Sequence, residues 1–129
     1  MRYEIITNTP PKPQELLKLF KQTTWASNRT EEGVKLLLQN TKNYVLIRDD
    51  KLLIGYGRAI SDGIYRAVLD DIVVDKNYRN QGIGHQIVQE LLHQVNNIEQ
   101  VFLSTKPELE HFYNTHGFVK SKSFSMSLD

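Results

Sequence analysis

Residues 73–84 are Val73-Val74-Asp75-Lys76-Asn77-Tyr78-Arg79-Asn80-Gln81-Gly82-Ile83-Gly84, and they join an apolar strand directly to the start of a helix. The glycines lie at the turn, where the absence of a Cβ lets a ligand approach the backbone. The first N–H groups of a helix have no partner within it, and the helix dipole favours negative charge there. The stretch therefore predicts a phosphate or pyrophosphate site, to which Arg79 can add a charged contact.

The same pattern excludes two common nucleotide-binding loops. It lacks the Gly-Lys-Ser/Thr ending of a Walker loop, and it lacks the third glycine and the acidic residue of a dinucleotide fingerprint. Taken alone, the pattern Arg-x-x-Gly-x-Gly is also compatible with a purely structural role. In that role the glycines only permit the tight turn from strand to helix.

Hydrophobic periodicity predicts strands and helices on both sides of this stretch. The expected strands cover residues 3–7, 44–48, 52–60, 64–74, 101–104 and 119–126. The expected helices cover residues 14–22, a short segment after Thr30, and residues 81–95 and 107–115. An antiparallel meander followed by a strand-helix-strand crossover predicts an α+β fold whose sheet has mixed strand directions.

Length and composition exclude several structural and functional classes for this protein. The chain has 129 residues, no cysteine and a formal net charge of +1. Its length predicts one domain over residues 1–129. The lack of cysteine excludes a disulfide framework, a thiolate metal site and a cysteine nucleophile. The near-neutral net charge argues against nucleic acid as a partner. The sequence has no long apolar run and no signal peptide, which predicts a cytoplasmic protein that does not enter a membrane.

Two segments together resemble the GNAT superfamily of acyl-CoA-dependent N-acyltransferases. The first is Arg79-Asn80-Gln81-Gly82-Ile83-Gly84, preceded by the apolar strand Ile72-Val73-Val74-Asp75. The second is Phe112-Tyr113-Asn114-Thr115-His116-Gly117-Phe118, which looks like the aromatic-Tyr-x-x-x-Gly-Phe segment of the family. Both occur in the family's order and spacing. The resemblance implies a mostly antiparallel central sheet of six to seven strands with four helices.

The resemblance also implies acetyl-CoA as co-substrate and no metal. The backbone of Ile72, Val73 and Val74 would bind the pantetheine arm, and Arg79 through Gly84 would hold the pyrophosphate. His85 follows this motif and could touch a phosphate or lie in solvent. The strands that flank the central helix would splay apart to admit the coenzyme. Lys106 stands where many members carry an asparagine that contacts the pantetheine.

The chemistry implied by the resemblance is direct attack of an amine on the thioester carbonyl within a ternary complex. Tyr113 matches the general acid that protonates the leaving thiolate, since a phenol pKa near ~10 is close to a thiol pKa near ~8.5. The base is left open between Asp70, Asp71 and a water chain. Carboxylates in an apolar strand are costly unless they are solvated, paired or functional. Alternation puts the two side chains on opposite faces of the strand unless a β-bulge intervenes. A non-catalytic role is the alternative, in which an exposed aspartate pairs with Arg58 or Arg66 across the sheet.

The acceptor is expected to meet the first two helices and the loop between them, where Trp25, Asn28 and Arg29 are the candidates. A small primary amine is the first prediction for this substrate. An amino-sugar phosphate or a protein amine stays open, as does a non-catalytic acyl-CoA sensor that keeps the fold. The histidines lack the paired spacing of a metal site.

The closing segment carries a signal for self-association. Phe124, Met126 and Leu128 alternate with serines in residues 120–128. Such a segment could form an edge strand or exchange one in a homodimer.

Overall fold

The computed structural model describes residues 3–128, and its centre is one five-stranded sheet in the order β1-β2-β3-β4-β5. The strands are β1 (Glu4–Ile6), β2 (Asn43–Asp49), β3 (Leu52–Ser61), β4 (Arg66–Val74) and β5 (Gln100–Phe102). Neighbours are antiparallel from β1 to β4, whereas β5 runs parallel to β4. The mixed α+β fold predicted from the sequence is confirmed.

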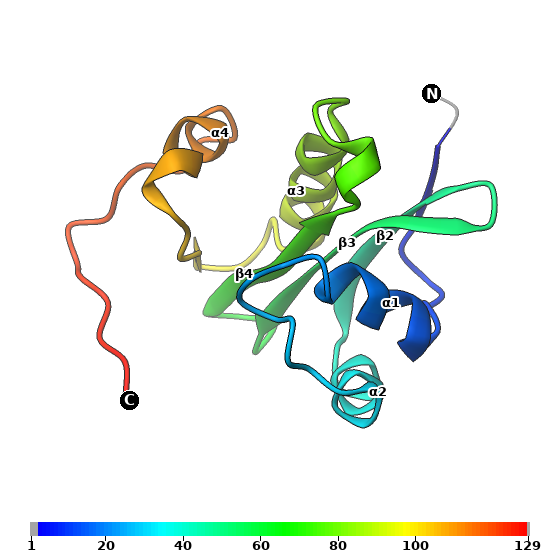
Figure 1. Cartoon of the computed structure of the whole chain (residues 1–129). Helices are drawn as coiled ribbons and strands as arrows, with labels where there is room; N and C mark the ends of the chain where they lie inside the picture. Colours follow the sequence, from blue (N-terminus) through cyan, green and yellow to red (C-terminus); the bar gives the residue numbers. More distant parts are fainter. Residues whose placement is uncertain (1–2, 129) are drawn as a thin grey trace.

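Helices cover both faces of the sheet (Figure 1). They are α1 (Pro13–Phe20), α2 (Glu31–Gln39), α3 (Ile83–Gln94) and α4 (Glu110–Asn114), with short 3-10 helices η1 (Lys76–Tyr78) and η2 (Pro107–Leu109). One buried cluster lies between the sheet and α3, and a second lies under α1 and α2. The start of α2 is capped by Thr30, whose Oγ1 accepts a hydrogen bond from the Gly33 N–H at 3.1 Å. The four predicted helices are present.

Two glycines of β3 set how closely α3 lies on the sheet. A Cβ added at Gly57 would lie 2.5 Å from Ile87 Cγ2, and one added at Gly55 would lie 3.1 Å from Ile87 Cδ1. Any side chain at Gly57 would push the helix outward. The backbone of β3 thus brings α3, and the loop before it, against the centre of the sheet.

The pairing of β4 with β5 ends halfway along β4. Its register runs only from Arg66 opposite Gln100 to Val68 opposite Phe102. Residues 69–74 of β4 therefore have no strand partner on that side within residues 3–128. This unpaired edge agrees with the splayed strands that the resemblance implies.

The predicted closing strand over residues 119–126 is wrong. The chain leaves α4 and runs away from the sheet to the C-terminus (Figure 1), and none of these residues is in a strand. Val119, Phe124, Met126 and Leu128 are 82% to 103% exposed. Alternation gives a segment an apolar face, but a strand also needs a hydrogen-bonding neighbour, and β5 does not serve as one here. Over residues 3–128 the sheet therefore has five strands, not the six to seven that the resemblance implies.

Within residues 3–128, the longest helices fall short of the length and apolar character that crossing a bilayer requires.

Candidate functional site

The glycine loop presents open backbone N–H groups at the start of α3. Asn80 and the N-cap residue Gly82 both adopt left-handed backbone conformations, with φ of 62° and 82°. The Gln86 N–H donates to the Gly82 carbonyl at 3.2 Å, and this bond begins the helix ladder. The N–H groups of residues 83–85 precede that bond and can face an anion, which the helix dipole also favours.

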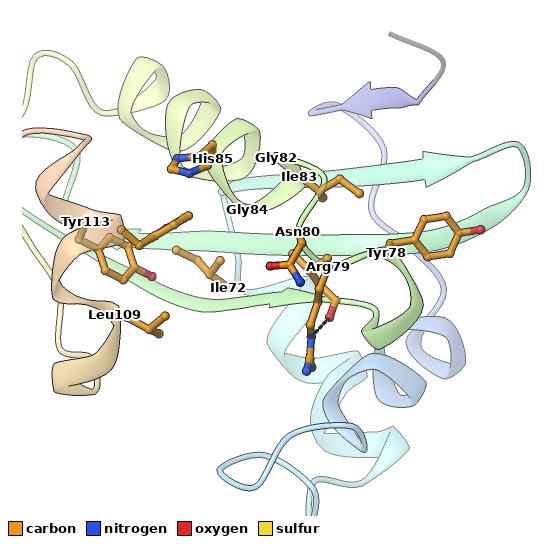
Figure 2. Close-up of a pocket in the computed structure, with 12 residues that line it drawn as sticks. Ile72, Tyr78, Arg79, Asn80, Gly82, Ile83, Gly84, His85, Leu109 and Tyr113 are labelled. Carbon is orange, nitrogen blue, oxygen red and sulfur yellow. Dashed lines mark hydrogen bonds between the residues drawn. The ribbon is translucent and has the colours of Figure 1, made fainter.

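A cavity of about 340 Å³ joins this loop to α4 (Figure 2). Its walls come from the end of β4, the glycine loop, the first turn of α3, and η2 with α4. The lining residues are Ile72, Val74, Tyr78, Arg79, Asn80, Gly82, Ile83, Gly84, His85, Leu109, Phe112 and Tyr113. The fold thereby brings together the two motifs that are far apart in the sequence.

Gly84 explains how α4 comes so close to the loop. A Cβ added at Gly84 would lie 3.3 Å from Phe112 Cζ and 4.0 Å from Val74 Cγ2. The glycine therefore lets Phe112 close one side of the cavity. Phe112 belongs to the second motif of the sequence analysis. Leu109 belongs to neither motif, so the sequence did not predict that it lines the cavity.

The side chains of three predicted coenzyme-binding residues are occupied by contacts with other parts of the protein. Val73 is buried in the cluster under α1 and α2, so its side chain lies on the face away from the cavity. Gln81 accepts a hydrogen bond from the Tyr3 hydroxyl at 2.6 Å and does not line the cavity. Arg79 folds back, and its Nε donates to the Val74 carbonyl at 3.4 Å (Figure 2).

Tyr113 is held by aromatic packing at the other end of the cavity. Its ring lies edge-on to Phe112 at 4.9 Å and to Phe118 at 6.0 Å between centroids. The side chain is buried, and this burial raises the pKa of the Tyr113 phenol. The hydroxyl therefore stays protonated at neutral pH, as a proton donor must.

A β-bulge sets the direction of the two adjacent aspartates. Tyr56 pairs with Val73 and Arg58 pairs with Asp70, so Asp71 and Ile72 together oppose one residue of β3. Asp71 has a φ of 54°, which is the left-handed conformation found at such bulges. The bulge that the alternation argument left open is present.

Because of the bulge, both carboxylates reach the same guanidinium. Arg58 Nε donates to Asp71 Oδ2 at 2.7 Å, and Arg58 Nη2 lies 3.6 Å from Asp70 Oδ2. The Asp71 side chain is 1% exposed, whereas that of Asp70 is 45% exposed. Neither side chain lines the cavity of 340 Å³.

The loop between α1 and α2 is tied to this bulge through Arg29. Arg29 Nη2 lies 3.0 Å from Asp71 Oδ1, close enough for an ion pair although not aligned as a hydrogen bond. The guanidinium also lies over the rings of Phe20 at 4.5 Å and Trp25 at 5.8 Å. Trp25 is half exposed and Asn28 is exposed. The three predicted acceptor residues thus lie on the side of β4 covered by α1 and α2, outside the cavity.

Two histidines meet beside the glycine loop. His85 Nδ1 and His116 Nε2 are 2.8 Å apart, and their rings lie 4.4 Å and 5.5 Å from that of Phe112. Burial, and then the proximity of His85, lowers the pKa of His116. Sequence spacing does not reveal this pair, because its members come from α3 and from the turn after α4. No group of three or more potential metal ligands gathers among residues 3–128.

A second cavity, of about 790 Å³, lies on the other side of Tyr113. It is bordered by residues 100–107, by Glu110 and Asn114 of α4, and by residues 117–121 together with Ser125 of the C-terminal segment. Lys106 lies in its wall. Lys106 is therefore separated from the glycine loop by Tyr113, which lines both cavities.

Comparison with known proteins matches residues 9–125 to the acetyltransferase (GNAT) domain. The uncharacterized N-acetyltransferase ycf52 of Pyropia yezoensis is 28% identical over 112 residues, which make up 82% of this chain and 64% of that protein. The chloroplastic GCN5-related N-acetyltransferase 1 of Arabidopsis thaliana is 29% identical over 95 residues, or 70% of this chain and 48% of that protein. A protein of unknown function from meticillin-resistant Staphylococcus aureus, described as a probable acetyltransferase, has a solved structure with a TM-score of 0.87 and 25% identity over 98% of both chains.

The chain spans about half to two thirds of the length of these two curated relatives. One of them is named as chloroplastic, so the cytoplasmic location expected from the sequence stays a prediction.

Proposed function

The chain belongs to the GNAT acetyltransferase family, and from that premise we propose that it transfers the acetyl group of acetyl-CoA to a primary amine of a small molecule. The amine attacks directly, within a ternary complex. The observation that supports this proposal most is the cavity of about 340 Å³, where the glycine loop, the first turn of α3 and Tyr113 meet.

The residues present fit the coenzyme. Its pyrophosphate would be held by the open N–H groups of residues 83–85 and by the guanidinium of Arg79, which can turn from the Val74 carbonyl toward the anion. Its pantetheine arm carries amides, and the unpaired edge of β4 over residues 69–74 offers backbone groups that amides can pair with. No basic cluster is needed, which agrees with the net charge of +1.

In the proposed reaction a C–N bond forms and the thioester C–S bond breaks. The amine loses a proton to a base, and the departing thiolate receives one from the Tyr113 hydroxyl. Tyr113 suits this role because its burial keeps the phenol protonated while the hydroxyl remains at the cavity wall.

Of the two aspartates, we assign the base to Asp70, acting through water. Its side chain is 45% exposed and can exchange protons with solvent. Asp71 is buried, and its two oxygens face Arg29 and Arg58, so its role in the proposal is to hold the bulge and the loop between α1 and α2. The acceptor would approach from that loop, where Trp25 offers an exposed aromatic face to an amine.

A panel of primary amines with acetyl-CoA tests the proposal, with release of free thiol as the readout. The protein has no cysteine, so every new thiol belongs to the coenzyme. The panel should include arylalkylamines, polyamines, amino-sugar phosphates and a peptide with a free N-terminus. We expect saturable turnover with at least one small amine. Calorimetric binding of acetyl-CoA without turnover on any amine would instead favour a coenzyme sensor, and no binding at millimolar coenzyme would refute both functions.

A further inference from the structure

Two histidines from distant parts of the sequence form a pair beside the glycine loop. His85 lies in the first turn of α3, and His116 lies in the turn that follows α4. Nδ1 of His85 and Nε2 of His116 are 2.8 Å apart, which is a hydrogen-bonding distance. The ring of Phe112 lies 4.4 Å from that of His85 and 5.5 Å from that of His116 between centroids, so it packs beside both imidazoles. The proposed function gives these two side chains no role.

The hydrogen bond between the rings determines how many hydrogens the pair can offer to a ligand. One hydrogen lies between Nδ1 of His85 and Nε2 of His116, because one of these nitrogens must donate and the other accept. In the neutral pair, only one of the two outer nitrogens, Nε2 of His85 and Nδ1 of His116, then carries a hydrogen. A single added proton gives both outer nitrogens an N–H and keeps the bond between the rings. The pair can therefore gain a charge and a donor without a change in its geometry.

The surroundings disfavour a positive charge on this pair in the absence of an anion. His85 lies at the positive end of the α3 dipole, which opposes a cation. Burial, and then the proximity of His85, lowers the pKa of His116. None of the ion pairs found among residues 3–128 includes either histidine. The charged and titratable groups on the neighbouring elements are Arg79 of the glycine loop, Glu90 and His93 of α3, and Glu110, His111 and Tyr113 of α4. The pair is thus neutral at pH 7 while no anion is near.

The anion that would reverse this balance belongs, in the proposed function, at the same helix start. His85 lines the cavity of about 340 Å³ (Figure 2), whereas His116 does not. We propose that the pair takes up one proton from solvent when a phosphate group of acetyl-CoA binds at the start of α3, and that His85 then donates to this phosphate. The inference rests on the proposed function. His116 is a positioning residue in it, because it shares the proton with His85 without lining the cavity.

Coenzyme affinity should then depend on pH in one direction. A negative charge within ~4–6 Å raises the pKa of an imidazole by about 1 unit or more, so the pair keeps its proton to a higher pH in the complex than in the free protein. Affinity is highest where the free and the bound pair both carry the proton, and it falls as the pH rises until the complex also loses it. Between pH 6.5 and pH 8 the affinity for acetyl-CoA should weaken about fivefold at constant ionic strength.

Calorimetry counts the protons that accompany binding. Acetyl-CoA is titrated at pH 7.0 in phosphate-free buffers of different ionisation enthalpy, and the slope of the observed enthalpy against that of the buffer gives the number taken up. The wild type should take up about 0.5 proton per bound coenzyme. His116→Gln keeps a hydrogen-bonding group near the position of Nε2 but cannot be protonated, so uptake should fall to about zero and affinity by roughly threefold. His111→Gln, at an exposed position of α4, is the matched control and should keep the uptake.

The outcomes separate this inference from the proposed function. Binding without proton uptake in the wild type would overturn the inference alone, and so would full uptake in His116→Gln. Absence of acetyl-CoA binding would refute the proposed function as well. Acetyl-CoA without its 3′-phosphate identifies which phosphate the pair meets. Retained uptake with this analogue assigns the pyrophosphate, lost uptake assigns the 3′-phosphate, and either result supports the charged pair.

Proton NMR of the wild type tests the inference even if His116→Gln does not fold. The chain has four histidines, and their ring signals can be assigned with single His→Gln variants. The signals of His85 and His116 should titrate at a pH about 1 unit higher in the acetyl-CoA complex than in the free protein. Those of His93 and His111 should titrate at the same pH in both. Unchanged titration of all four histidines would contradict proton uptake by the pair.

Discussion

At the scale of single residues, Gly82 and Gly63 form a natural pair for separating backbone strain from coenzyme binding. Both have left-handed backbones, with φ of 82° and 85°, and a Cβ added at either meets no atom within 4 Å. Gly82→Leu and Gly63→Leu should therefore each destabilise the fold by about 1–2 kcal/mol. Only Gly82→Leu should weaken acetyl-CoA binding, by tenfold or more, because its side chain would stand where the pyrophosphate approaches.

Thermal unfolding measures the strain in both glycine variants, and calorimetric titration with acetyl-CoA measures affinity. Equal affinities for the two variants would mean that the anion does not bind at the start of α3.

The hydroxyl of Tyr113 can be removed while its ring stays in place. In Tyr113→Phe the ring still packs between Phe112 and Phe118, so the fold and the KM for acetyl-CoA should change little. The kcat should fall about 10²-fold if the phenol protonates the thiolate. Because burial raises the pKa of Tyr113, the wild-type rate should not decline from loss of this proton until above the ordinary phenol value of 10.0.

Tyr65→Phe is the matched control for Tyr113→Phe, since Tyr65 is 58% exposed beside the β3–β4 turn. An unchanged kcat in Tyr113→Phe would remove this residue from the mechanism.

At the scale of elements, the bulge in β4 depends on the charge of Asp71. Asparagine has the same shape and tolerates the left-handed conformation, so Asp71→Asn removes mainly the negative charge between Arg29 and Arg58. Leaving two guanidinium groups beside a neutral buried amide should cost about 2–3 kcal/mol in the free energy of unfolding. Asp70→Asn should cost less than ~1 kcal/mol, because that side chain is 45% exposed. Urea unfolding of both variants measures the difference, and similar losses would mean that the buried pairs do not hold the bulge.

The sequence predicted those elements whose formation depends on local pattern. The meander, α3 and the glycine loop follow from alternation, helical periodicity and the placement of Gly82 and Gly84. The bulge was left open because alternation cannot locate an extra residue; it arises from pairing with β3. The strand over residues 119–126 was predicted wrongly because its alternation says nothing about which edge is available. The contact of His85 with His116 escaped prediction because only the tertiary fold brings the two together.

For the whole molecule, Glu15 and His116 should each make the free energy of unfolding depend on pH, and they should do so over separate pH ranges. Glu15 of α1 accepts hydrogen bonds from Arg48 of β2 at 2.8 Å and 3.0 Å, and this contact lowers the Glu15 pKa below its ordinary 4.5. The unfolded chain therefore binds the proton first, so the stabilisation is present above pH 4.5 and is lost as the pH falls through the lowered value. The pKa of His116 is also lowered, from 6.5, so protonation of the unfolded chain reduces stability as the pH falls below 6.5.

Glu15 lies on the α1 side of the sheet and His116 lies beside α3. Substituting either residue should therefore remove its own contribution to the pH dependence of the free energy of unfolding and leave the other contribution intact. Glu15→Gln should lower the free energy of unfolding by about 1 kcal/mol at pH 7, with the difference from wild type shrinking below pH 4.5. His116→Asn should flatten the slope that begins at pH 6.5 and leave the lower pH range unchanged. Urea unfolding at half-unit steps from pH 8 to pH 3 resolves both. If His116→Asn kept the full slope between pH 6.5 and pH 5, the histidine would not be the titrating group, and the close contact with His85 would have no part in the acid response of the molecule.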